Sequence, residues 1–86
     1  MNQTLKDLSI RFDAILINMK KGSDLDFELF DLSLDVITET LRLNKLVSKI
    51  AYNNKSLEEN IQLLKDYYEA NDLQDKIQDV INKNIK

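Results

Sequence analysis

Four acidic residues along one face of a predicted helix form the clearest candidate site in this sequence. They are Glu28, Asp31, Asp35 and Glu39, spaced by three, four and four residues, so they fall on successive turns. No Lys or Arg stands between Asp24 and Glu39. A surface of this kind attracts and steers a partner with a basic surface. We therefore expect this acidic ridge to bind a partner protein. An alternative explanation is that acidic side chains in the first half of a helix interact favourably with the helix dipole.

Catalysis and metal binding are poorly supported by the same carboxylates. Acid–base catalysis needs a carboxylate whose pKa is shifted by burial in a cleft, and the sequence predicts no cleft here. Asp24, Asp26 and Glu28 resemble the start of an EF-hand calcium loop, but the Gly and the later Glu of that loop are missing. The chain has no His, no Cys and only two Arg. It therefore lacks the groups for thiolate or imidazole metal sites, nucleophile–His pairs and multi-arginine pockets, and we expect no enzyme activity and no cofactor.

Composition points to a small folded protein that binds other proteins. The 86 residues are 43% hydrophobic, which is enough for a core. The net charge of −3 argues against nucleic acid as a partner. No apolar run approaches the roughly 18 residues that would span a bilayer, so we expect no membrane partner and a cytoplasmic location. Nine Asn and nine Ile against three Ala are typical of an AT-rich coding source, such as a low-GC bacterium or its phage.

A second candidate surface lies on the first predicted helix. Its core-facing stripe has the three-and-four spacing of a packed helix and comprises Leu5, Leu8, Phe12, Ile15 and Met19. Ile10, Ala14 and Ile17 form another apolar stripe, about 120–180° round the helix from Leu5. One neighbouring helix cannot cover both faces. We expect this second stripe to contact either another helix, a partner protein or a second copy of the chain.

The elements that position these residues are all predicted to be helical. Four pairs resemble helix N-caps with an acid three residues on: Thr4–Asp7, Ser23–Asp26, Ser56–Glu59 and Asp72–Asp75. The only glycine, Gly22, follows two lysines, as expected at a helix C-terminus. The sequence thus predicts one all-α domain over residues 1–86, a bundle of about four helices at about 4–21, 24–52, 56–70 and 73–85. The second would be a long central helix.

Apolar periodicity predicts which helix faces meet. In the central helix the core residues are Leu25, Leu29, Leu32, Val36, Leu43, Val47 and Ile50. A second stripe on its opposite side comprises Phe27, Phe30, Leu34, Ile37 and Leu41, where we expect the first helix to return. Because so short a chain buries a limited core, the alternative is that part of this stripe belongs to an interface. The third helix presents Leu57, Ile61, Leu64 and Tyr68. Because Leu73, Ile77, Val80, Ile81 and Ile85 would fall on the wrong side of a continuing helix, we expect a break at Asn71–Asp72.

These features favour a non-catalytic protein–protein interaction module, such as an inhibitor, an immunity protein or a regulatory adaptor. One alternative is a homodimeric helical-hairpin scaffold or a secretion-type chaperone. A second alternative is a degenerate acyl-carrier-like domain. Residues 29–36, Leu-Phe-Asp-Leu-Ser-Leu-Asp-Val, resemble the start of the acyl-carrier helix that bears phosphopantetheine. In this sequence Val36 stands where the attachment serine is expected.

Overall fold

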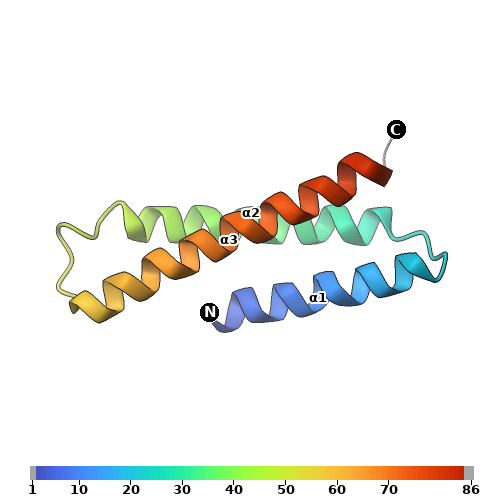
Figure 1. Cartoon of the computed structure of the whole chain (residues 1–86). Coiled ribbons are helices and arrows are strands. Elements are labelled where there is room, and N and C mark those ends of the chain that lie inside the picture. The colour runs from blue at the N-terminus through green and yellow to red at the C-terminus, as the bar shows by residue number, and fades with distance from the viewer. Residues whose placement is uncertain (1, 85–86) are drawn as a thin grey trace.

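The computed structural model describes residues 2–84, which form three α-helices and no strand. The helices are α1 (Gln3–Lys20), α2 (Asp26–Val47) and α3 (Leu57–Asn84). Figure 1 shows α1 and α2 as an antiparallel hairpin, with α3 returning obliquely across α2. The all-α prediction is confirmed, whereas the expectation of about four helices is wrong.

Local sequence signals fix some of the helix ends and miss others. Ser56 and Glu59 form the predicted capping box, in which the Glu59 N–H donates to Ser56 Oγ at 3.2 Å. At the first helix the cap is Asn2 rather than Thr4, because Asn2 Oδ1 accepts from the Leu5 N–H at 2.8 Å. The N-cap of α2 is Leu25, without a side-chain cap bond, so the Ser23 prediction is also wrong.

The first turn is built as the glycine predicts. Gly22 has a φ of +93°, which an L side chain rarely adopts. Its N–H donates to the Met19 carbonyl at 3.0 Å, and the Ser23 N–H donates to the Asn18 carbonyl at 3.2 Å. These two bonds satisfy carbonyls that the end of α1 would otherwise leave open. The chain can then reverse and start α2 at Asp26.

The second turn begins earlier than the sequence predicts. We expected the central helix to continue to about residue 52, but α2 ends at Val47 and residues 48–52 form hydrogen-bonded turns. The turns use shorter-range bonds, such as the Lys49 N–H to the Leu46 carbonyl at 3.2 Å. Apolar periodicity through Ile50 does not reveal this change, because turn residues can also bury side chains against the end of a helix.

A three-helix core lies along one face of α2. Its main cluster takes three buried residues from each helix: Leu8, Phe12 and Ile15, then Leu29, Leu32 and Val36, then Leu73, Ile77 and Ile81. A smaller cluster joins Leu5, Leu43 and Ala70 near the other end of α2. The predicted core faces of the first two helices are therefore confirmed over these residues.

The predicted break at Asn71–Asp72 is wrong, because α3 runs through it as one helix of 28 residues. Its buried face follows Asp66, Ala70, Leu73, Ile77 and Ile81, with helical spacing throughout. The first two residues of this face are an acid and an alanine. The hydrophobicity of the sequence alone therefore does not identify the buried face of α3. Asp72 does not cap a helix but pairs with Lys76 at 3.1 Å on the surface of α3. Ile85, the last residue of the expected fourth helix, lies outside the described residues.

The molecule is long and thin for its size. Its Cα extents are 49 × 21 × 15 Å and its radius of gyration is 14.8 Å, against about 12 Å for a compact 86-residue domain. Its accessible surface is 6081 Å², compared with about 5,300 Å² for a typical 10.1 kDa monomer. Much of each helix is therefore left without a neighbour.

Candidate functional site

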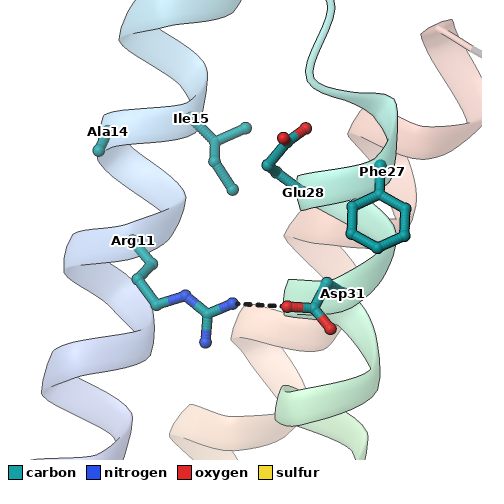
Figure 2. A pocket seen from close by; sticks show the side chains of 6 residues that line it. All are labelled: Arg11, Ala14, Ile15, Phe27, Glu28 and Asp31. Atoms are coloured by element: carbon teal, nitrogen blue, oxygen red, sulfur yellow. Dashed lines mark hydrogen bonds and ion pairs between the residues drawn. The ribbon is translucent and has the colours of Figure 1, made fainter.

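Two members of the acidic ridge face a base from another helix. Arg11 of α1 donates to Asp35 Oδ2 at 2.7 Å and to Asp31 Oδ2 at 3.5 Å. Figure 2 shows the Arg11 side chain reaching across the groove between α1 and α2 toward Asp31. All three side chains remain about half exposed. No base stands between Glu28 and Glu39 in the sequence of α2, but the fold supplies Arg11 from α1.

Glu39, the last member of the ridge, belongs to the interior rather than to the surface. It is 5% exposed. Its carboxylate accepts from Arg42 Nη2 at 2.8 Å and from Asn2 Nδ2 at 3.2 Å. The Arg42 hydrogen bond, opposed by desolvation and reinforced by the charge of Arg42 and by Asn2, holds the pKa of Glu39 below its usual value of 4.5. Glu39 is therefore an ionised structural residue that ties the start of α1 to α2.

The exposed acidic surface is thus shorter than the sequence predicts. Glu28, Asp31 and Asp35 remain accessible, with Arg11 among them. Three negative charges against one positive charge still give this patch an acidic character. A basic partner can reach these three carboxylates, whereas Glu39 is closed to it.

The apolar stripe of α1 is where the sequence places it. Ile10, Ala14 and Ile17 are all exposed on the side of α1 away from the core. No other helix of the described chain covers them. The structure therefore leaves this stripe accessible to another molecule.

A shallow groove joins the α1 stripe to the acidic patch. It has a volume of about 310 Å³ and lies between α1 and α2 (Figure 2). Its lining residues are Arg11, Ala14, Ile15, Phe27, Glu28 and Asp31. The walls are mainly apolar with charges at the rim, a composition typical of a contact surface for a side chain of a partner.

The largest apolar surface is one that we expected to be buried. Phe27, Phe30, Leu34, Ile37 and Leu41 form the outer face of α2, opposite its core face. Ile37 is half-buried, whereas the other four are 78%, 49%, 62% and 57% exposed in that order. The prediction that the first helix covers this face is wrong. α1 instead packs beside Asp31 and Asp35, roughly 100° round α2 from the middle of the outer face.

The spacing of the outer face already contained a signal for an interface. Its residues follow a three, four, three, four pattern, which is the apolar repeat by which two helices pair along their length. We expected the first helix to return on this side, with an interface as the alternative for part of the stripe. Only the position of α1 shows that this face has no covering neighbour among the described residues.

The outer side of α3 is also partly apolar. Leu57, Ile61 and Tyr68, which we expected in the core, are exposed, and Leu64 is half-buried. They lie on the N-terminal half of α3, away from the face that packs on α2. This surface has fewer large apolar residues in regular succession than the outer face of α2.

Within residues 2–84, no group of three or more acidic residues is arranged to hold a metal ion. None of the helices in that range is long and apolar enough to cross a bilayer. Comparison with protein-family models, with curated proteins and with solved structures finds no match for this chain.

Proposed function

We propose that this chain is a non-catalytic protein–protein interaction module that binds through the outer face of α2. One observation carries the proposal: four large apolar residues, Phe27, Phe30, Leu34 and Leu41, lie exposed in one stripe along a single helix. Exposed apolar residues scattered singly are normal in soluble proteins, but a contiguous stripe marks a contact site. Burying such a stripe against another protein removes the unfavourable apolar hydration that the isolated chain retains.

The charged residues support binding rather than catalysis. Both arginines of the chain are already engaged by its own carboxylates, Arg11 by Asp31 and Asp35, and Arg42 by Glu39. An anionic substrate or transition state would have to compete with these ion pairs. We therefore assign Arg11 to holding α1 against α2, and Arg42 to compensating the buried charge of Glu39 within α2.

We further propose that the module works as an inhibitor, immunity protein or regulatory adaptor in the cytoplasm of a bacterium, or on behalf of a phage. The acidic patch of Glu28, Asp31 and Asp35 favours a partner with basic residues next to its apolar surface. The absence of Cys is compatible with a reducing compartment. The amino-acid composition favours an AT-rich coding source.

Site-specific photo-crosslinking in the cells that encode the chain tests this function. A photoreactive residue is placed singly at Leu34 on the outer face, at Glu28 on the acidic patch and at Ile17 on the α1 stripe. We expect protein adducts mainly from position 34. Adducts mainly from position 28 would favour the acidic patch as the binding surface, and those from position 17 the α1 stripe. No protein adduct from any of the three positions would contradict an interaction module.

A further inference from the structure

We propose that the partner of the outer face of α2 is the same face of a second copy of this chain, packed antiparallel about a two-fold axis near Leu34. This inference rests on the proposed function, because it names the occupant of the same surface. With the axis at Leu34, Phe27 of one copy meets Leu41 of the other, and Phe30 meets Ile37. The stripe is matched along its whole length in this register.

Residue size favours this antiparallel register. The two large aromatic residues, Phe27 and Phe30, occupy the N-terminal half of the stripe, and the aliphatic Ile37 and Leu41 occupy the C-terminal half. Antiparallel pairing therefore places one aromatic against one aliphatic residue at each end. Parallel pairing would stack phenylalanine on phenylalanine at one end and leave smaller residues together at the other.

The distribution of charge along α2 also favours antiparallel pairing, because the two ends of the helix carry opposite charges. Acids dominate the N-terminal end of α2 and its preceding turn, whereas Arg42, Lys45 and Lys49 dominate the C-terminal end and the turn after it. In the antiparallel pair, Lys45 of one copy lies level with Ser23 of the other, one residue from Asp24 and three residues from Asp26. A parallel pair would place the acidic ends side by side, where like charges repel.

The exposed area is appropriate for a two-helix interface. A fully exposed Phe or Leu side chain presents on the order of 150–200 Å², so the observed exposures leave roughly 370–490 Å² of apolar surface on the outer face. This is about half of the roughly 800 Å² that each partner buries in a standard interface. The polar residues beside the stripe supply the remainder. The interface also uses surface that makes the single chain more exposed than a typical monomer of its mass.

Sedimentation equilibrium tests the self-association directly. Between about 10 µM and about 1 mM protein, we expect the mass of the chain to rise from 10.1 kDa toward twice that value. Leu34→Asp places a charge at the two-fold axis, and we expect it to raise the dissociation constant by about 100-fold or more. The matched control is Ile17→Asp, since Ile17 is 55% exposed against 62% for Leu34 but lies on α1. The control should dimerise normally, and circular dichroism should show both variants to be as helical as the original chain.

A pair of cysteine variants tests the orientation, because the natural chain contains no Cys. Phe27→Cys and Leu41→Cys are oxidised separately and as an equal mixture. In the antiparallel dimer, each new thiol lies about 21 Å along the helix axis from the same residue of the other copy, which is too far for a disulfide. The thiol at position 27 of one variant instead lies level with the thiol at position 41 of the other, so we expect a disulfide only between the two different variants. Disulfides within each separate variant, and none between the two, would show a parallel pair and overturn the proposed arrangement.

The remaining outcomes separate this inference from the proposed function. A chain that stays monomeric at about 1 mM overturns the dimer, and so does a dimer abolished by Ile17→Asp but not by Leu34→Asp. If that monomeric chain still forms adducts with a different protein from position 34, the interaction module stands with another partner. If the dimer forms as described, adducts at twice the mass of the chain are expected from position 34 in cells.

Discussion

At the residue scale, Glu39 shows how one position changes meaning between sequence and structure. In the sequence it continues a row of surface acids, but in the fold it is buried and bonded to Arg42 and Asn2. A buried carboxylate is tolerated only when hydrogen bonds and an opposite charge compensate for the lost hydration. Here the compensation comes from one turn of α2 and from the residue that caps α1.

The depressed pKa of Glu39 makes stability depend on pH in a defined direction. Because this pKa is lower in the folded than in the unfolded chain, the ionised carboxylate stabilises the fold fully above about pH 4.5, and its contribution is lost as the pH falls below that value. We expect Glu39→Gln to lower the free energy of unfolding at pH 7 by about 1–3 kcal/mol. The difference between variant and original chain should shrink toward pH 3.

Urea unfolding at pH 7, 4.5 and 3 measures this effect. Glu28→Gln serves as the control, because Glu28 is exposed and its substitution should change stability by no more than about 0.5 kcal/mol. An equal loss of stability in Glu39→Gln at all three pH values would show that the ionised carboxylate is not what stabilises the fold.

At the element scale, α3 shows the limits of reading a helix from its apolar residues. Two of its five buried residues are Asp66 and Ala70, and Asp66 accepts a hydrogen bond from Gln62 at 3.0 Å. The more hydrophobic Leu57, Ile61 and Tyr68 lie on the outside. The position at which α3 crosses α2 decides which residues of α3 are buried. The buried face can therefore be identified only when this crossing is known.

Alanine substitution at two isoleucines of α3 tests its register. Ile77 is buried in the three-helix cluster, so we expect Ile77→Ala to lower the free energy of unfolding by about 2–5 kcal/mol. Ile61 is exposed, and Ile61→Ala should cost less than about 1 kcal/mol. Chemical denaturation of the two variants measures both values. Equal losses, or a larger loss at Ile61, would support the core face that we first read from the sequence.

At the scale of the whole molecule, the three helices form an elongated body instead of a compact bundle. α2 is in contact with both other helices, whereas its outer face remains uncovered. In a chain of this length, one face of each helix is enough to form the core. The second apolar stripes on the three helices are then left largely exposed.

Small-angle X-ray scattering measures this shape. The monomeric Leu34→Asp variant in dilute solution should have a radius of gyration of about 15 Å, close to the 14.8 Å of the Cα trace and above the about 12 Å of a compact chain of this length. The Ile17→Asp variant at the same concentration is the control for the added charge. A value near 12 Å for the Leu34→Asp variant would show that α1 or α3 folds over the outer face in solution.

The sequence alone determined the helical class, the turn at Gly22, the capping box at Ser56 and the core faces of α1 and α2. These features depend on residues within about one or two turns of each other, through hydrogen bonds, backbone conformation and helical spacing. Local signals also gave a wrong prediction at Asp72, where the sequence resembles an N-cap but α3 is continuous.

Only the tertiary structure decided which face of α3 is buried, that α3 is continuous, that the outer face of α2 is uncovered, and that Arg11 meets Asp31 and Asp35. The sequence identified the core stripes of α1 and α2, but it does not show whether a second apolar stripe on the opposite side of a helix also has a neighbour within the chain. That depends on contacts between residues far apart in the chain. The same packing leaves the outer face of α2 exposed as the main candidate surface.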